Sequence, residues 1–246
     1  MLQDLHIHTI FSDGTDEIEN ILSVSKQNNI EIGIADHIYC KKLVSIDSIL
    51  DYFSILARYP VFKGAEFDIG KAIILDDRIL SISDYVIGSI HCIDIDGEVI
   101  NFGKYFDSRA ENKVLNSNYI FDDYVCCKAL EIILEKIRKE VLVNPIDIIG
   151  HCTVNPFYEQ VNSKFRFEWE NALISICESS HIALEISGLW IEPDIDLIQK
   201  AINKNVKLTF GSDCHTPYSM SYLDYFKFVK NNLNLSEGDF KRFGKE

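Results

Sequence analysis

Most histidines in this chain stand at the ends of short apolar runs. Of the seven histidines, five lie at or just after the end of a run that reads as a β-strand, and His8 joins them if His6 and His8 count as one pair. These runs cover residues 2–8, 30–37, 85–91, 146–151 and 206–215, and a further run, residues 61–66, ends at Glu66. Parallel α/β barrels gather functional side chains at the carboxyl ends of successive strands. The pattern therefore predicts such a barrel, with a metal site at that face.

The apolar runs alternate with stretches of helical periodicity. We expect strands at residues 2–8, 30–36, 61–66, 85–91, 147–150, 182–186 and 206–210, and helices at residues 15–29, 46–58, 119–139, 167–179, 195–203 and 222–229. This alternation predicts a parallel sheet. An open sheet would concentrate its ligands at one crevice, whereas here they come from nearly every strand. We therefore predict a distorted seven-stranded (β/α)7 TIM-like barrel, a single domain over residues 1–246. Residues 92–118 form the longest irregular connection, a candidate lid.

Length and composition indicate the domain size and the cellular compartment to expect. The 246 residues, 47% of them hydrophobic, are ample for one α/β barrel with a full core. No run of 18 apolar residues is present, so we expect no transmembrane helix, and the start MLQDLHIHT has no secretory signal pattern. The seven cysteines lack paired CxxC spacing, which indicates reduced thiols. These features predict a cytoplasmic protein.

The net charge of the chain indicates which partners it is expected to bind. The formal net charge is −14, and no basic cluster stands out along the chain. An acidic surface repels phosphate backbones, so nucleic acid is disfavoured as a partner. Part of the acidity would be neutralised by divalent cations bound inside the molecule.

The pair His6 and His8 opens the candidate site. Residues two apart on a strand point to the same face, so both imidazoles would face the barrel interior while Leu5 and Ile7 pack outward on helices. Buried imidazoles without a polar partner are costly, and a divalent metal would be that partner.

Further ligand candidates follow the next two strands. Asp13 precedes Gly14, and it is either a turn residue or an oxygen ligand. His37 ends the second strand. Asp36, the residue before it, would orient the His37 ring without binding the metal itself. Glu66, at the inner end of an apolar strand, would bridge two cations or otherwise pair with a base such as Lys63.

The later strands supply the rest of the set. His91 and His151 each end a strand in which small residues leave room for a ligand to turn inward. Asp213 and His215, two apart after the last strand, add a carboxylate and an imidazole. His181 opens a strand at the opposite mouth and is interpreted as structural. Nitrogen and oxygen ligands suit zinc, manganese or iron, so we expect two or three divalent metal ions of these kinds.

Together these motifs resemble a known family. They are Asp4-Leu5-His6-Ile7-His8-Thr9, Ser12-Asp13-Gly14, Ala35-Asp36-His37, Gly64-Ala65-Glu66, the isolated His91 and His151, and Gly211-Ser212-Asp213-Cys214-His215. In this order, over residues 4–217, the set resembles the PHP (polymerase and histidinol phosphatase) family. The resemblance implies a distorted seven-stranded barrel whose two- or three-metal site hydrolyses phosphoesters.

The resemblance also implies roles for the candidates. One metal would be held by His6, His8, Glu66 and Asp213, a second by His91, His151 and the shared Glu66, and a third by Asp13, His37 and His215. Asp213 or His215 would orient the nucleophile or pass a proton to the leaving group. Histidinol phosphatases are expected to carry histidine in place of Asp13. Residues 183–189 resemble their strand-six motif, but Trp190 stands near the expected place of a basic residue.

We therefore expect a metal-dependent phosphomonoesterase whose partner is a small phosphorylated metabolite, with histidinol phosphate as one candidate. A metal-dependent 3'-5' exonuclease or another phosphodiesterase is the alternative activity. An amidohydrolase also uses a His-x-His pair in a barrel, but it would be expected to place a bridging lysine at a strand end. An inactive metal-binding scaffold is the alternative that is not an enzyme.

Overall fold

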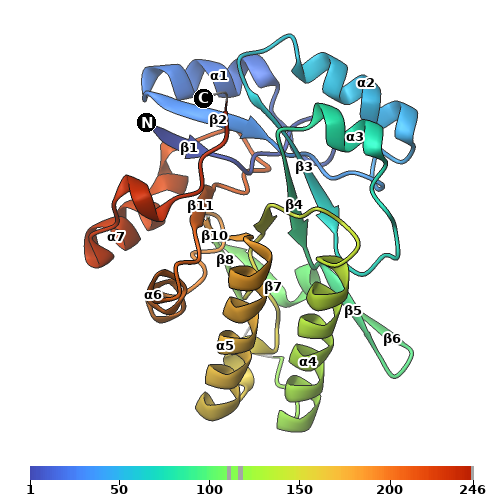
Figure 1. The fold of residues 1–246 in the computed structure, drawn as a ribbon, viewed down its shortest axis with the longest axis vertical. Coiled ribbons are helices and arrows are strands. Elements are labelled where there is room, and N and C mark those ends of the chain that lie inside the picture. The colour runs from blue at the N-terminus through green and yellow to red at the C-terminus, as the bar shows by residue number, and fades with distance from the viewer. Residues whose placement is uncertain (110–111, 116–118, 245–246) are drawn as a thin grey trace.

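Seven parallel strands form the centre of the molecule (Figure 1). The computed structural model describes residues 1–109, 112–115 and 119–244, with the backbone alone described at 107–109 and 112–115. In spatial order the strands are β1 (Leu2–Asp4), β2 (Ile30–Ile34), β3 (Phe62–Asp68), β4 (Tyr85–Ser89), β9 (Ile148–Ile149), β10 (Ala183–Ser187) and β11 (Leu208–Gly211). All neighbouring pairs in this order are parallel, as predicted.

The first and last strands meet, so the sheet forms a nearly closed barrel. The amide of Leu5 donates to the carbonyl of Phe210 at 2.9 Å, and the amide of Asp213 donates to the carbonyl of His6 at 2.7 Å. Farther along, the amide of His8 donates to the carbonyl of Cys214 at 3.0 Å. The predicted TIM-like α/β barrel is confirmed, and its closure brings segments more than 200 residues apart into contact.

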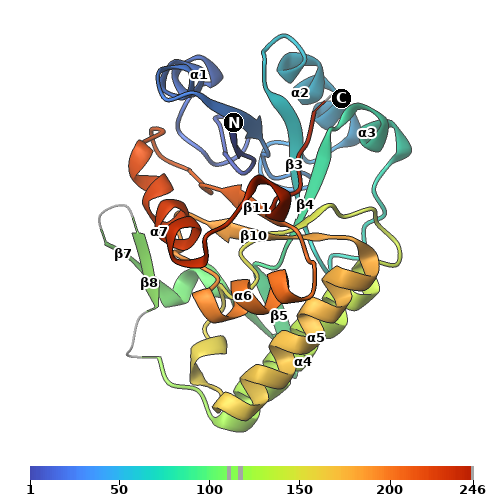
Figure 2. The same ribbon diagram turned by 60° about the vertical axis from the view of Figure 1, so that its left-hand side comes forward.

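Helices surround the barrel and connect its strands. They are α1 (Ile18–Gln27), α2 (Ile46–Leu56), α3 (Asp77–Ile82), α4 (Asp123–Glu140), α5 (Ser163–Ser180), α6 (Ile195–Asn203) and α7 (Leu223–Leu233). Short 3-10 turns are η1 (Phe102–Tyr105), η2 (Tyr158–Gln160), η3 (Met220–Tyr222) and η4 (Glu237–Asp239). In Figure 2 the helices α4 and α5 lie side by side. None of the described helices is long and apolar enough to cross a membrane.

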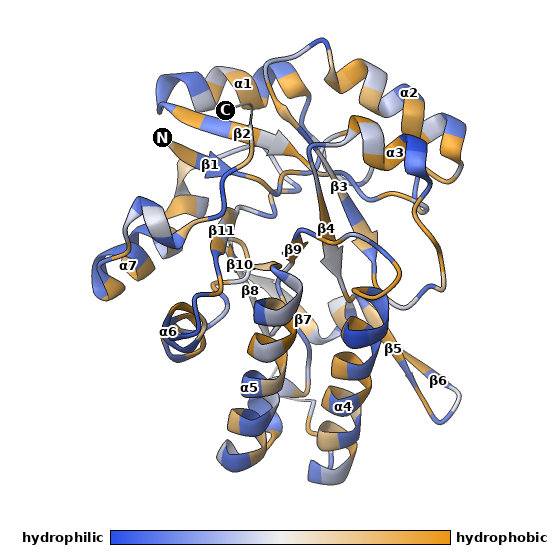
Figure 3. Cartoon of the chain, in the orientation of Figure 1, coloured by the Kyte–Doolittle hydropathy of each residue, from blue (hydrophilic) through white to orange (hydrophobic). Residues whose placement is uncertain are grey.

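Local sequence explains where several helices begin. Asn162 and Asp194 cap α5 and α6 by accepting hydrogen bonds from backbone amides three residues on. Ser45 and Ser48 form a reciprocal capping box at the start of α2. Along the helices hydrophobic and hydrophilic residues alternate (Figure 3), as expected for helices with one face on a barrel.

A small apolar cluster lies apart from the main hydrophobic core. It joins residues of β4, β9 and β10 to the residues directly after β1 and β2: Leu5, Ala35, Tyr85, Ile87, Ile148 and Ala183. The hydroxyl of Tyr85 donates to the carbonyl of Leu5 at 2.5 Å, and Phe243 packs on the Tyr85 ring. The outward alternation predicted for Leu5 is wrong, because β1 ends at Asp4 and Leu5 joins this interior cluster.

The connection after β4 contains regular structure. It holds the antiparallel hairpin of β5 (Cys92–Ile95) and β6 (Glu98–Asn101), and the hairpin of β7 (Phe106–Arg109) and β8 (Asn112–Leu115). The prediction of an irregular connection over residues 92–118 is therefore wrong for the part that the structure describes. Residues 110–111 and 116–118 lie outside it, and the lid role stays a prediction.

Candidate metal centre

The candidate ligands converge at the carboxyl-terminal face of the barrel. Four overlapping groups bring potential ligand atoms within 4.8 Å of one another. They are His8, Asp13, His37 and His215; His6, Glu66 and His151; His6, His8 and Asp213; and His37, Glu66 and His91. All nine residues singled out from the sequence as metal ligands belong to at least one group.

Glu66 lies at the centre of this arrangement. It projects from β3, is 1% exposed and has imidazoles on both sides of its carboxylate. Its Oε1 lies 3.1 Å from His151 Nε2, 3.4 Å from His91 Nε2 and 3.5 Å from His6 Nε2. Its Oε2 lies 2.7 Å from His37 Nδ1 and 3.4 Å from His8 Nε2. One carboxylate therefore faces ligand candidates from four other segments.

Two further carboxylates complete the set. Asp213 Oδ1 lies 3.2 Å from His8 Nε2 and 3.6 Å from His215 Nδ1. Asp13 Oδ1 lies 3.6 Å from His215 Nε2, near the open rim of the site. These contacts place oxygen donors on two more sides of the imidazole cluster.

The grouping differs in part from the one that the family resemblance implies. His151 groups with His6 and Glu66, whereas His91 groups with His37 and Glu66. His8 belongs to two groups, one with Asp213 and one with the rim residues. The two groups with Glu66 nevertheless share this carboxylate.

Charges in the cluster stabilise one another. Burial raises the pKa of Glu66, but the imidazoles of His37 and His6 outweigh it, and the net pKa is well below the usual range. Burial lowers the pKa of His8 to about 3, so its imidazole is neutral. Burial also lowers the pKa of His91, but Glu66 and Asp68 outweigh it and raise this pKa to about 10. Since a metal ligand must be deprotonated, a divalent cation bound here would displace protons from imidazoles such as His91.

Glu185 supports two of the ligand candidates at once. From β10, its Oε1 lies 2.7 Å from His6 Nδ1, and its Oε2 accepts a hydrogen bond of 2.8 Å from the amide of His151. These contacts orient the His6 ring, whose Nε2 then faces Glu66 and Asp213. In metal sites, the ring nitrogen of a histidine that does not bind the metal usually donates a hydrogen bond to a carboxylate or another acceptor.

Asp68 is a supporting residue that the sequence analysis missed. It contacts His91 Nδ1 and is also paired with Lys71. The sequence spacing could have identified it. Asp68 follows Glu66 by two positions on β3, and residues two apart point to the same face of a strand.

Trp190 is the second missed partner. Its indole Nε1–H donates to Asp213 Oδ2 at 2.5 Å. The ring also packs near His151, with centroids 6.2 Å apart. The indole therefore lies directly against the predicted ligands.

One expected pairing, of Asp36 with His37, and one alternative pairing, of Lys63 with Glu66, are both replaced by others. Asp36 accepts hydrogen bonds from the amide and hydroxyl of Thr9 and from the Ser12 hydroxyl, so it fixes the loop after β1 instead of orienting His37. Lys63 pairs with Asp84 at 2.9 Å, which leaves Glu66 to the imidazoles.

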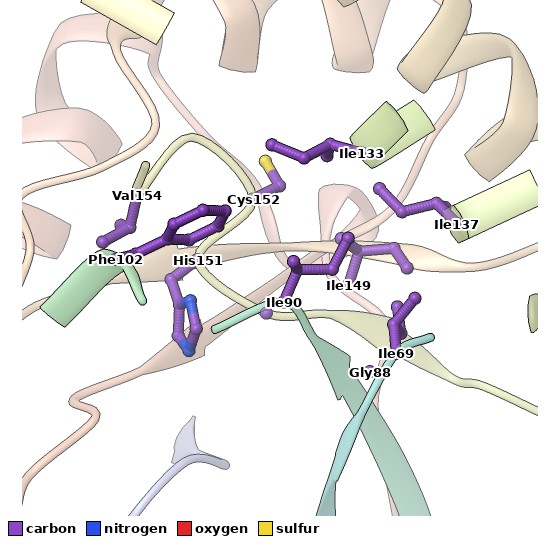
Figure 4. A pocket seen from close by; sticks show the side chains of 11 residues that line it. Ile69, Gly88, Ile90, Phe102, Ile133, Ile137, Ile149, His151, Cys152 and Val154 are labelled. Carbon is purple, nitrogen blue, oxygen red and sulfur yellow. The ribbon is translucent and has the colours of Figure 1, made fainter. Parts of the chain in front are cut away.

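An apolar layer backs the site on one side. A small pocket between β4, β9 and α4 is lined by five isoleucines, among them Ile90, Ile133 and Ile149, together with His151, Cys152 and four other residues. Figure 4 shows the His151 ring pointing away from these side chains. Burial in this layer raises the pKa of the Cys152 thiol well above its usual range, so the thiol is neutral.

Comparison with known proteins gives a match at the level of the fold. No family model matches the chain, and no curated protein matches it. Among solved structures, it is similar to a histidinol phosphate phosphatase from Lactococcus lactis, solved with zinc, L-histidinol and phosphate. The two share 14% identity, the match covers 99% of each chain, and the TM-score is 0.66. At this identity the likeness shows a common fold.

Proposed function

We propose that this protein is a metal-dependent phosphomonoesterase that acts on a small phosphorylated metabolite. The observation that carries the proposal is the convergence of six imidazoles and three carboxylates at the carboxyl-terminal face of the barrel. The similar fold of a histidinol phosphate phosphatase supports it.

The donor set fits divalent cations. Zinc, manganese and iron accept imidazole nitrogen and carboxylate oxygen, which are the atoms gathered here. Glu66 Oε2 is buried and accepts no hydrogen bond from the described residues, although His37 Nδ1 lies 2.7 Å away. A cation held by Glu66 together with neighbouring imidazoles would satisfy the oxygen, which a buried carboxylate requires. Glu66, shared between two groups, would bridge two such ions.

The chain's own residues would hold the substrate and move the proton. When bound, the cations would acidify a water molecule and stabilise charge on the phosphoryl group. The Nδ1–H of His215 donates to the carbonyl of Asp213 at 2.9 Å, which leaves its Nε2 toward Asp13 at the rim. His215, about one quarter exposed, would in its imidazolium form pass the Nε2 proton to the leaving alcohol as the P–O bond breaks, a role that it would take in place of binding a cation. Lys41 is half-exposed, with its Nζ 3.3 Å from Asp13 Oδ2, where it could also reach a phosphoryl oxygen.

Histidinol phosphate is one candidate substrate. The similar structure was solved with L-histidinol and phosphate, which is the reason to include it. Asp13 and Trp190 are the two positions at which this chain departs from the expected histidinol phosphatase pattern. Other small phosphomonoesters are therefore candidates as well.

A substrate panel tests the proposal. The full chain would be assayed with Zn²⁺ or Mn²⁺ on p-nitrophenyl phosphate, its bis-ester, histidinol phosphate, nucleotides and single-stranded DNA. We expect metal-dependent turnover of a monoester that Glu66→Gln abolishes and the exposed control Glu178→Gln retains. Turnover of diesters alone would replace the proposal with a phosphodiesterase. Bound metal without any turnover would indicate an inactive metal-binding scaffold.

A further inference from the structure

Trp190 occupies a defined place beside the candidate metal centre. It lies in the turn after β10, and this turn is anchored to the segment after β11 because the amide of Leu189 donates to the carbonyl of Ser212 at 3.0 Å. The indole packs edge-on against Phe106, with centroids 5.0 Å apart. The ring is therefore held by backbone and by side-chain packing, and its N–H has a fixed direction.

That direction divides the two oxygens of Asp213 between different partners. The indole N–H donates to Oδ2 at 2.5 Å. The other oxygen, Oδ1, lies 3.2 Å from His8 Nε2 and 3.7 Å from His6 Nε2. Asp213 itself has a φ of +52°, an uncommon conformation for a residue with a side chain, and its amide is bonded to the carbonyl of His6. Backbone and indole together aim Oδ1 at the imidazole pair.

We propose that Trp190 is a positioning residue that reserves Asp213 Oδ1 for the metal by holding Oδ2. An indole suits this task because it is a donor only, carries no charge and does not itself compete for a cation. The inference rests on the proposed function, since it assigns Asp213 to a metal held with His6 and His8. A free carboxylate would rotate and offer either oxygen, so the site would be less well ordered before binding.

The consequence is a lower metal affinity when the donor is removed. Loss of a residue that forms a hydrogen bond with a metal ligand typically lowers the metal affinity 10- to 100-fold. Trp190→Phe keeps an aromatic ring against Phe106 but removes the N–H. We therefore expect the dissociation constant for Zn²⁺ to rise about 10- to 100-fold at one site.

The chain offers its own optical reporter and control. It contains two tryptophans, and the other, Trp169, is buried on α5 with its N–H bonded to the carbonyl of Leu130. In Trp169→Phe, only Trp190 would fluoresce, and adding Zn²⁺ to the metal-free chain should change the emission. In Trp190→Phe, the remaining Trp169 should show no change.

The experiment combines this fluorescence titration with calorimetry of Zn²⁺ binding to the metal-stripped full chain. The expected result is a Zn²⁺-dependent emission change in Trp169→Phe, together with weaker binding in Trp190→Phe. Equal Zn²⁺ affinity of Trp190→Phe and the wild type would overturn the inference and leave the proposed function standing. An unchanged emission of Trp169→Phe on Zn²⁺ binding would also overturn it, even if Trp190→Phe does not fold. If the wild type binds neither Zn²⁺, Mn²⁺ nor Fe²⁺, the proposed function and the inference both fail.

Discussion

At the scale of single residues, the ligand candidates could be predicted from sequence, and Glu185 could be singled out as either a supporting residue or a substrate contact, but the partners of the supporting residues could not be predicted. His6, Glu66 and Asp213 each follow a short apolar run, and a run's end is visible in the sequence. The contact of Glu185 with His6 spans 179 positions, and it depends on which ring nitrogen faces β10. Such a contact follows from the closed barrel, which brings β10 and the end of β1 together.

Glu185 leads to the first prediction. Glu185→Ala leaves His6 Nδ1 and the amide of His151 without their acceptors. Because unpaired buried polar groups are costly, we expect the free energy of unfolding to fall by about 2–3 kcal/mol. We also expect Zn²⁺ affinity to fall about 10- to 100-fold. Urea unfolding in EDTA and calorimetry would measure the two effects. Unfolding and binding curves that match the wild type would show that Glu185 supports neither contact.

Glu192 predicts a pH-dependent stability. Its side chain accepts a hydrogen bond from Thr153, and burial with the nearby Glu159 and Asp194 raises its pKa to about 7. A raised pKa means that folding disfavours the ionised form, so stability is lost as the pH rises from the unfolded pKa near 4.5 through 7. Glu192→Gln removes this penalty.

We therefore expect Glu192→Gln to be more stable than the wild type at pH 8, by up to about 3 kcal/mol, and the difference to vanish near pH 4. Urea unfolding of both chains across this range, in EDTA, would measure it. A constant difference between the two chains at every pH would contradict the assignment.

At the scale of elements, the strands that line the barrel and most helices could be predicted, because their apolar periodicity is regular. The predicted helix over residues 195–203 coincides with α6 (Ile195–Asn203). The hairpin of β5 and β6 was missed although its signal was present. Asp96 and Gly97 both have positive φ, which is typical of the Asp-Gly turns that join two-stranded hairpins. The short α3 spans six residues, too few to show a clear helical period.

The packing of β2 against Tyr85 gives a prediction at this scale. A Cβ at Gly33 would lie 2.1 Å from the Tyr85 hydroxyl oxygen, and that hydroxyl is held by its hydrogen bond to Leu5. Overpacking a filled interior costs about 1–3 kcal/mol, so Gly33→Ala should lower the free energy of unfolding by this amount. The matched control is Gly238→Ala, whose added Cβ meets its nearest atom at 3.6 Å. Equal unfolding midpoints for the two variants would show that Tyr85 can move aside.

At the scale of the whole molecule, the barrel could be predicted because ligand candidates follow nearly every strand. Such a distribution requires all strand ends to meet on one face, which a closed sheet provides. Which imidazole faces which carboxylate could not be predicted, because the early end of β1 at Asp4 and the positive φ of Asp213 set these directions.

Metal removal is the prediction that belongs to this scale. Ions held by segments from β1 to β11 would bind only the folded chain, so they would stabilise it. A ligand present at 100 times its dissociation constant raises the free energy of unfolding by about 2.7 kcal/mol for each site. For a chain of this size we expect the melting temperature to rise about 5–10 °C with Zn²⁺ or Mn²⁺ over that in EDTA. Differential scanning fluorimetry would measure the shift, with Mg²⁺ as the comparison ion. The same melting temperature in EDTA and in saturating Zn²⁺ would contradict a metal centre at the barrel mouth.

The ligand candidates that meet after β1 and after β11 lie near opposite ends of the chain, so they are synthesised at different times. Translation produces His6 and His8 first, whereas Asp213 and His215 are added only after β10 has been made. A nascent chain on the ribosome therefore carries an incomplete set of ligand candidates until β11 has emerged and docked beside the first strand. The full set of ligand candidates therefore comes together only after the first and last strands of the sheet have met.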